Sequence, residues 1–367
     1  MRREKSVPRA DWPARLEELG FDFHTIDGEP YWREDVCYAF TSDEVDTIEA
    51  ATAELHALCL DAVDRIVLGG MYGELGLDEA AAQLVERSWR AREPALYGRM
   101  DLAWDGTGAP KLLEYNADTP TALFEASVVQ WYWLQDVRRE ADQFNSIHEK
   151  LIERWRALAL RGKIHFAACY EQAEDRATSE YLRDTAHQAD LETTALDIEE
   201  IGWSGRTFFD LDNQPIATLF KLYPWEWLLD ETFGANIPAA PTRWIEPAWK
   251  MLLSNKSILP LLWEFNPHHP NLLAASHRRL DLQGRFVSKP RHGREGEGVI
   301  VLGPGLSEPP ADAAQVYQQF QQLPKFDDRY ALIGSWMIGD EPAGIGMRED
   351  ADPVTRNTSC FVPHWFA

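Results

Sequence analysis

The sequence predicts an α+β fold, and two patterns predict it. Residues 99–116 alternate polar and apolar side chains on both sides of a turn-forming stretch, which is typical of an antiparallel strand pair. Residues 164–170 and 191–198 are short apolar strands separated by a helix expected over Thr178–Ala189, which predicts a βαβ unit with parallel strands. Amphipathic helices are expected over residues 9–20, 43–68 and 78–90.

The strand pair at 99–116 carries the polar residues on which the functional hypothesis depends. If its loop closes a symmetric hairpin, Asp101 lies opposite Glu114 and Arg99 lies opposite Asn116. Two carboxylates directly across a ladder repel each other. A hard divalent cation such as Mg2+, bound by oxygen ligands, would remove that cost. The alternative interpretation is that all four side chains form the solvated face of an antiparallel sheet.

A helix is expected immediately after this hairpin. Thr119 is placed to cap it, and Pro120 stands at the first helical position. The backbone amides at the start of such a helix would form an anion site beside the expected metal.

Composition limits the class of protein. A chain of 367 residues with 45% hydrophobic residues and 15 Trp can bury a large core. No stretch approaches about 18 consecutive apolar residues, so no membrane span is expected. The net charge of −24 argues against nucleic acid as a partner. It would suit a cationic substrate such as a polyamine, although acidity of this kind usually serves only solubility.

The cellular setting is predicted from the N-terminus and the cysteines. The first 20 residues are charged and lack the apolar core of a signal peptide. The four cysteines are scattered and form no CxxC pair or zinc spacing. A reduced, cytoplasmic setting is therefore expected. The sequence leaves a homodimer open.

Three charged residues allow two interpretations each. Glu180 is either a substrate contact or a solvated acid near a helix start, favoured by the helix dipole. Lys221 lies inside an apolar run, where it either pairs with an acid or meets an anionic ligand. Arg348 ends the second strand of a hairpin expected around Gly339-Asp340, and it is either a surface ion-pair partner or a contact to a transferring phosphoryl group.

A flap over a nucleotide is predicted between residues 284 and 302. Lys289 ends a strand and leads into a turn containing Gly293, Gly296 and Gly298, after which an apolar strand returns. Glycines let backbone amides approach phosphates, and Lys289 with Lys256 would neutralise their charge. The spacing is not that of a P-loop.

An adenine-binding edge is expected where the next strand runs into a loop, because backbone groups there are open to hydrogen bonding. The candidates are Gln318, Gln319, Phe320 and Gln321.

Several motifs occur in the order found in the glutathionylspermidine synthase family, which this sequence resembles over most of its length. They are LLEYNADTPT, FKLYPWEW, EPAWKMLLSNKSILPLLWEF, SKPRHGREGEGV and YALIGSWMIGDEPAGIGMRED. The resemblance implies an ATP-grasp-like fold in a rearranged order, with a βαβ pre-ATP-grasp-like subdomain and a β-hairpin lid. It also implies ATP and Mg2+ as cofactors. The implied activity is ligation of a peptide-like or amino-acid-like acid to an amine, through an acyl phosphate.

The resemblance further implies a role for each candidate residue. Mg2+ would be held by Asp101, Glu114 and Asn116, and Arg99 and Arg348 would stabilise phosphoryl transfer. ATP would contact Lys256, Lys289, Gly293, Arg294, Gly296, Gln318, Gln319, Phe320 and Gln321. The acid substrate would lie near Thr119, Thr121 and Glu180, with Lys221 as a further candidate from its own position.

The chain is expected to divide into four segments. Residues 1–150 would hold helices and the metal-binding hairpin, 151–245 the βαβ subdomain, 246–325 the lid subdomain, and 326–367 the return to the catalytic core.

The sequence resembles the stand-alone, synthetase-like branch, because bifunctional members carry an additional amidase domain for which this chain is too short. The lid is also rich in charge, through Arg291, Arg294 and Glu295, so glutathione and spermidine are not assumed as substrates. Two other function classes remain open. One is a nucleotide-binding regulatory module without turnover, and the other is a small-molecule kinase acting on a hydroxyl group.

Overall fold

The computed structural model describes residues 1–26, 28–279, 282–294, 296–303, 314–356 and 359–367. Its α-helices are α1 (Trp12–Glu18), α2 (Ser42–Gly69), α3 (Glu79–Arg90), α4 (Gln130–Val137), α5 (Ile147–Ala157), α6 (Ala173–Gln188), α7 (Trp225–Asp230), α8 (Met251–Ser254) and α9 (Ile258–Phe265). A π-helical turn, η2 (Glu125–Val129), precedes α4, and short 3-10 turns occupy η1 (Met71–Leu75), η3 (Ile198–Glu200), η4 (Gly234–Ala239) and η5 (Ala248–Lys250).

The strands form three larger sheets and three smaller ones. Their bounds are β1 (Arg2–Lys5), β2 (Thr25–Ile26), β3 (Glu29–Pro30), β4 (Val36–Phe40), β5 (Tyr97–Ala103), β6 (Lys111–Asn116), β7 (Ile164–Ala168), β8 (Thr193–Asp197), β9 (Gly202–Trp203), β10 (Phe208–Phe209), β11 (Thr218–Leu222), β12 (Arg243–Ile245), β13 (Ala275–Ser276), β14 (Phe286–Pro290), β15 (Ile300–Leu302), β16 (Gln315–Gln319), β17 (Lys325–Phe326), β18 (Arg329–Ile338), β19 (Glu341–Asp350), β20 (Cys360–Val362) and β21 (His364–Phe366).

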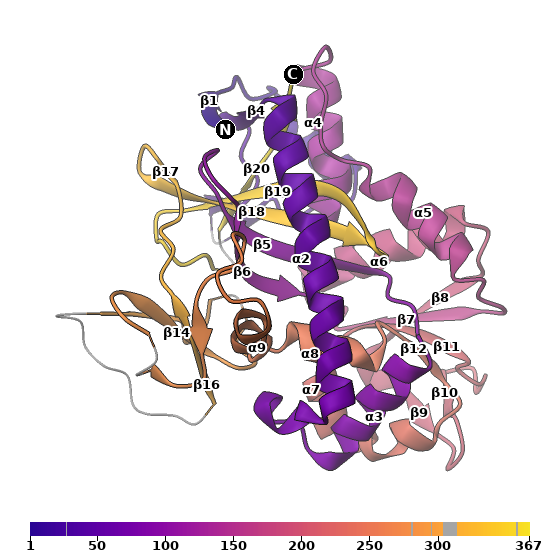
Figure 1. The fold of residues 1–367 in the computed structure, drawn as a ribbon. Helices are drawn as coiled ribbons and strands as arrows, with labels where there is room; N and C mark the ends of the chain where they lie inside the picture. The colour runs from indigo at the N-terminus through magenta and orange to yellow at the C-terminus, as the bar shows by residue number, and fades with distance from the viewer. Residues whose placement is uncertain (27, 280–281, 295, 304–313, 357–358) are drawn as a thin grey trace.

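The central sheet joins the predicted hairpin to the C-terminal part of the chain. Its order is β20-β19-β18-β5-β6, with all neighbours antiparallel. The turn between β18 and β19 is the expected one, and Gly339 adopts a φ of 58° there, which favours glycine. Figure 1 shows the long α2 lying across this sheet. Helix α2 packs there because its apolar residues recur on one face, including Val45, Ile48 and Leu55.

The predicted βαβ unit is confirmed. Strands β7 and β8 are parallel neighbours connected by α6, and β11 and β12 extend the same sheet in the order β12-β11-β7-β8. Helix α6 begins at Ala173 instead of the expected Thr178. Its first turn contains Glu174 and Asp175, which are favoured at a helix N-terminus but add nothing to the apolar periodicity from which the start was predicted.

The flap residues lie in a third sheet, ordered β13-β16-β14-β15, which stands apart from the body of the molecule in Figure 1. Strands β14 and β15 are antiparallel, as the lysine-ended strand and returning strand predicted. The four proposed segment boundaries stay a prediction, although the three larger sheets fall largely within the segments that were expected to hold them.

One local prediction was wrong. No helix starts at Pro120: the chain stays irregular to Ala122, whose φ is +63°, and becomes helical only at Leu123. The loop is held because Asp118 is buried and accepts hydrogen bonds from Lys221 and the Trp225 amide. Strand β11 ends at Leu222, two residues before Pro224, and residues from Trp225 onward form α7.

Helices α1, α2 and α3 fall on the three expected helical ranges. In the ranges that the structure describes, no helix combines the length and apolar character needed to cross a bilayer. All four cysteines carry free thiols.

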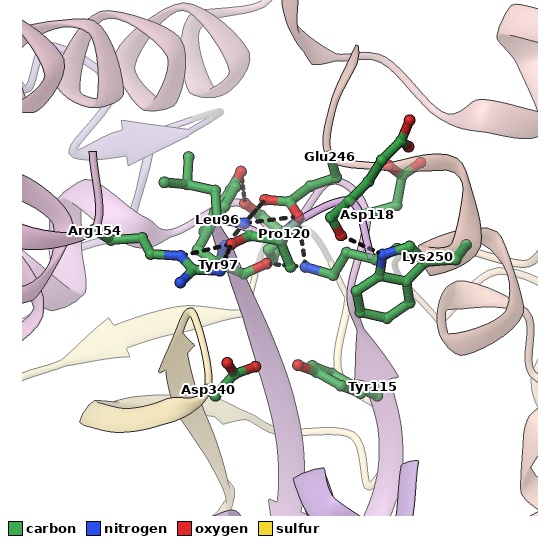
Figure 2. A network of polar contacts seen from close by, with 12 residues as sticks. Leu96, Tyr97, Tyr115, Asp118, Pro120, Arg154, Glu246, Lys250 and Asp340 are labelled. Atoms are coloured by element: carbon green, nitrogen blue, oxygen red, sulfur yellow. Dashed lines mark hydrogen bonds and ion pairs between the residues drawn. The ribbon is translucent and has the colours of Figure 1, made fainter. Parts of the chain in front are cut away.

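A buried ion pair fixes the start of β5 against the parallel sheet (Figure 2). The Glu246 carboxylate, fully buried after β12, accepts hydrogen bonds from the Leu96 amide at 3.1 Å and the Tyr97 amide at 2.9 Å. Its counter-charge is Lys250, whose Nζ lies 2.8 Å away and also donates to the Tyr97 carbonyl. A buried charge of this kind is tolerable only while every partner is present.

We expect Glu246→Ala to destabilise the protein strongly, because it leaves the Lys250 ammonium buried without a counter-charge. Loss of one partner of a buried pair costs about 3–5 kcal/mol of unfolding free energy. Thermal and urea unfolding measure the effect. The matched control is Asp61→Asn, which removes an exposed i,i+4 partner of Arg65 on α2 and should leave the midpoints nearly unchanged. Equal shifts in the two variants would contradict the assignment.

Candidate active site

The register of β5 and β6 brings the predicted metal ligands together. Asp101 pairs with Glu114 and Arg99 with Asn116, as the symmetric hairpin predicted, and a bulge follows Asp101. The alternative of a solvated sheet face was wrong for β5, because Asp101 is only 4% exposed and Arg99 8%. Asn116 Nδ2 lies 3.2 Å from Asp101 Oδ2 and 3.3 Å from Glu114 Oε1, so the three side chains converge on one point.

Cations compensate both carboxylates. Arg99 Nε donates to Asp101 Oδ1 at 2.7 Å, and Lys256 Nζ lies 3.1 Å from Glu114 Oε2. Burial would raise the pKa of Glu114, but the charges of Lys256 and Lys289 outweigh it and lower that pKa to about 2. Glu114 is therefore ionised at neutral pH and available as an oxygen ligand.

Lys289 reaches the same point from β14. Its Nζ donates to the Leu113 carbonyl at 2.9 Å, next to Glu114. Burial lowers the pKa of Lys289 to about 8; Glu114 opposes this shift and Lys256 adds to it. Lys256 also donates to the Gly293 carbonyl at 2.5 Å, which ties the glycine turn to the base of the site.

Two cavities meet at the paired carboxylates. The narrow cavity, about 90 Å³, lies between the β14–β16 sheet and β6, and its walls include Lys256, Lys289 and the segment 318–321. The wide cavity, about 550 Å³, lies on the other side. Its walls include Arg99, Asn116, Thr119, Thr121 and Arg348. Asp101, Glu114 and Gly296 line both cavities.

The predicted adenine-binding residues line the narrow cavity. Gln318 is 1% exposed and donates through Nε2 to the Leu112 carbonyl at 3.1 Å, while its Oε1 is buried without a partner among the described residues. A buried acceptor of this kind is costly unless a ligand donates to it. Gln319, Phe320 and Gln321 follow along the same wall.

The glycine turn approaches the C-terminal hairpin closely. Gly296 has a φ of +73°, and a Cβ there would lie 2.4 Å from the Thr355 carbonyl oxygen, so only glycine fits. Gly293 lies at the other end of the turn, and Glu295 falls outside the described residues.

Arg294 lines the wide cavity instead of the narrow one. Its Nη1 donates to Thr119 Oγ1 at 2.8 Å and its Nη2 to Glu226 Oε1 at 2.9 Å, with the guanidinium over the Trp227 ring. The role in ATP binding expected for Arg294 is therefore not supported by its position. Thr119, expected as a helix cap, accepts the Arg294 hydrogen bond in the loop before the helix.

Two predicted substrate residues lie elsewhere. Glu180 lines neither cavity; it pairs with Arg183 on the exposed side of α6 and accepts from Tyr170 Oη at 3.1 Å. Its position agrees with the solvated-acid interpretation. Lys221 is completely buried, and its Nζ lies 2.6 Å from Asp118 Oδ1, so the structure selects the ion-pair alternative.

Arg348 and Thr121 both reach the wide cavity. Arg348 lies near the end of β19, and its Nη2 donates to the Arg356 carbonyl at 2.5 Å. The Thr121 carbonyl accepts from Arg99 Nη1 at 2.7 Å, which holds the loop after β6 against β5.

Sequence reasoning missed several residues of the wide cavity, among them Tyr31, Glu174, Asp175 and Trp227. Glu174 and Asp175 could have been found, because they follow β7 at the carboxyl end of a parallel strand, where ligands bind in open α/β sheets. Trp227 is 49% exposed at the cavity rim. Tyr31 carries no local signal, since only the tertiary fold brings its loop to β20.

Within the described ranges, no group of three or more His, Cys, Asp or Glu side chains could hold a metal ion. The candidate metal centre is therefore the pair Asp101 and Glu114 completed by the Asn116 amide.

Comparison with known proteins defines the class. The chain is 43% identical over 392 residues to a Haemophilus influenzae protein named "Putative acid--amine ligase", with 100% of both chains covered. It is 26% identical over 387 residues to the trypanothione synthetase of Crithidia fasciculata, covering 95% of this chain and 57% of that protein. These relatives place the chain among the ligases that form C–N bonds.

The family is also defined. The family model described as glutathionylspermidine synthase preATP-grasp matches residues 3–367, and the chain belongs to that family. Among solved structures it is similar to a glutathione synthetase-like effector of Globodera pallida, with a TM-score of 0.60, 11% identity and coverage of 99% of this chain and 100% of that one. This likeness shows a shared mixed α/β fold.

We expect Lys289 to lose its proton near pH 8, below the value of about 10.4 for a free lysine side chain. Glu114→Gln should lower the Lys289 pKa further, because it removes the negative charge that opposes burial. The rate of Lys289 acetylation against pH, read by mass spectrometry, gives both values. The exposed Lys325 serves as the reference for reagent reactivity. A Lys289 pKa that rises in the variant would contradict this electrostatic arrangement.

Proposed function

We propose that this chain is an ATP-dependent acid–amine ligase that activates a carboxylate as an acyl phosphate and transfers the acyl group to an amine. One observation carries the proposal: the cavity lined by lysines and the cavity lined by arginines meet at Asp101 and Glu114. A γ-phosphoryl group held between the two carboxylates and the two cavities would face a substrate carboxylate directly, as in-line transfer requires.

The donor set fits Mg2+. Two carboxylates and one amide offer hard oxygen ligands, which Mg2+ prefers together with phosphate oxygens and waters. The Asn116 amide, which lies within 3.3 Å of both carboxylates, would turn its oxygen toward the cation. Bound there, Mg2+ would neutralise charge on the transferring phosphoryl group. Asp101, Glu114 and Asn116 would be its protein ligands.

The nucleotide would occupy the narrow cavity. Lys256 and Lys289 supply positive charge beside Glu114, and the buried Gln318 Oε1 could accept a hydrogen bond from an exocyclic amine of the base. The cavity is too small for a nucleotide in this conformation. The β14–β15 hairpin therefore acts as the lid of an ATP-grasp-like fold, opening to admit ATP and closing to exclude water.

The acid would occupy the wide cavity. Arg99 and Arg348 present fixed guanidinium groups, which suit a carboxylate and then the charge developing on the phosphoryl group. The substrate carboxylate oxygen attacks the γ-phosphorus, and ADP leaves. Thr119 and Thr121 line the same wall, where their hydroxyl groups could contact a peptide-like acid.

The amine would approach along the acidic side of the wide cavity. Glu174 and Asp175, in the first turn of α6, attract a cation, and the net charge of −24 steers it there. The amine nitrogen attacks the acyl carbon, and phosphate leaves. Measurement decides which acid and which amine, polyamine-like or otherwise, the protein uses. It also decides whether the chain forms a homodimer.

The test is ADP formation with ATP, Mg2+ and a panel of peptide and amino-acid acids and amines. The ligase predicts ADP release that requires both acid and amine, and transfer of 18O from the acid carboxylate into phosphate. A phosphorylated product formed without an amine would identify a kinase instead. Nucleotide binding without ADP release would identify a regulatory module.

We expect chelation of divalent cations to abolish ADP release and added Mg2+ to restore it. Asp101→Asn and Glu114→Gln should each lower kcat by about 100-fold or more, because each removes a ligand charge from the reacting centre. Glu180→Gln is the matched control, since Glu180 lies outside both cavities, and kcat should stay within about twofold. Retained activity in Asp101→Asn would refute the metal assignment.

We expect Arg348→Lys to lower kcat by about 100-fold while the KM for ATP stays nearly constant. A lysine keeps the charge but loses the planar pair of donors that matches a transferring phosphoryl group. Steady-state kinetics with saturating acid and amine give both constants. A change confined to the KM for ATP would place Arg348 at the nucleotide instead.

A further inference from the structure

The amine step needs a proton acceptor, and this requirement rests on the proposed function. An aliphatic amine has a pKa of about 10, so at neutral pH it arrives as an ammonium ion whose nitrogen has no free lone pair. It becomes a nucleophile only after a proton has been removed within the closed site. General-base groups of this kind contribute about 10²–10⁴-fold to rate.

Tyr31 and Glu125 form a hydrogen-bonded pair at the wall of the wide cavity. Tyr31 lines that cavity together with Arg99, Arg348 and Glu174. Its Oη donates to Glu125 Oε1 at 2.7 Å. Glu125 is 1% exposed and lies behind the tyrosine, so Tyr31 is the route by which the cavity reaches this carboxylate.

Both members of the pair are fixed in place. The Tyr31 ring packs against Phe21 and Phe23, with ring centroids 6.2 and 5.9 Å away. Its amide donates to the His24 carbonyl at 2.9 Å, and its carbonyl accepts from the Phe361 amide at 2.6 Å. Glu125 begins the π-helical turn η2, an irregularity that is frequent at functional sites.

Glu125 differs from the buried acids that serve only structure. Asp118 and Glu246 each have a lysine within 2.8 Å, whereas in the described part of the chain no ion pair closes around Glu125. The charged groups that face it are Glu174 from α6 and Arg348 from β19. Burial, with the negative charge of Glu174, raises the pKa of Glu125 to about 7, which suits proton exchange at neutral pH.

We propose that Tyr31 and Glu125 form the proton relay of the amine step. The ammonium proton passes to Tyr31 Oη while the Tyr31 proton passes to Glu125 Oε1, which leaves a neutral amine. The amine lone pair forms the C–N bond, and the C–O bond to phosphate breaks with its electron pair on phosphate. The second proton shed by nitrogen goes to the departing phosphate, and Glu125 returns its proton to solvent after product release.

In this scheme Tyr31 is the catalytic residue, because it touches the amine, and Glu125 is a positioning residue that acts through it. Glu125 accepts protons only when ionised, so the amine-dependent rate of the unmodified protein should rise as the pH passes about 7. Acyl-phosphate formation needs no proton transfer to this pair, so its rate should not show this rise near pH 7.

The experiment compares two nucleophiles: the amine of the panel above that gives the fastest ADP release, and hydroxylamine. Hydroxylamine is neutral at pH 7 and traps the acyl phosphate as a hydroxamate. In Tyr31→Phe and Glu125→Gln, amine-dependent turnover should fall by about 100-fold, and hydroxamate formation should stay within about twofold. In Glu125→Gln, the rise of the amine-dependent rate near pH 7 should disappear. Tyr31→Phe keeps the ring in its aromatic contacts, so it tests the relay even if Glu125→Gln fails to fold.

Tyr181→Phe is the matched control. Tyr181 Oη hydrogen-bonds Ser127 Oγ on the same π-helical turn, yet Tyr181 does not line the wide cavity. It should leave both rates unchanged. Equal losses of amine-dependent turnover and hydroxamate formation would mean that the pair has only a structural role. An unchanged rise of the amine-dependent rate near pH 7 in Glu125→Gln would identify Glu174 as the base. Either result overturns the relay. Absence of hydroxamate in the unmodified protein would overturn the proposed function itself.

Discussion

The site depends on two carboxylates held opposite each other across β5 and β6. Like charges in this position destabilise an isolated hairpin, so the arrangement persists only where cations surround it. Here Arg99 comes from the same strand, Lys256 from the segment between α8 and α9, and Lys289 from β14. Because both lysines come from parts of the chain distant from β5 and β6, their contacts with this site hold the flap sheet against the central sheet.

This convergence gives the two cavities their common wall. The lysines face the narrow cavity and the arginines the wide one, so each side presents positive charge to the same acidic centre. In the proposed reaction, this arrangement would hold the nucleotide and the acid apart until the phosphoryl group is transferred between them. Arg294 spans the same boundary from the glycine turn, since it contacts Thr119 and Glu226 on the far side. The contacts of the glycine turn therefore extend into the wall of the wide cavity.

Buried charges have two distinct roles in this molecule. Glu246 with Lys250 (Figure 2), and Asp118 with Lys221, are fully enclosed pairs that fix loops and strand ends. Asp101 and Glu114 differ because an open cavity lies on each side of them. Lys221 shows that the sequence does not distinguish these two roles. A lysine in an apolar run gives the same pattern whether it contacts a ligand or an aspartate 103 positions away.

The sequence by itself determined the local geometry. Alternation with period two and a loop of suitable length fixed the pairing of Asp101 with Glu114, and apolar periodicity located α2, α3 and the βαβ unit. The ends of elements were less certain, because a polar first turn such as Ala173–Asp175 carries no periodic signal. Local patterns supplied the flap lysines and the glutamine segment as candidates, and the family motifs connected them to ATP.

Only the tertiary structure decided which of these residues share a cavity. It placed Glu180 on an exposed helix face, enclosed Lys221 with Asp118, and turned Arg294 toward Thr119. It also brought Tyr31 and Glu125 together at the wall of the wide cavity. The physical reason is that side-chain partnership depends on desolvation and approach between distant segments, whereas a sequence pattern records only which face of its own helix or strand a residue occupies.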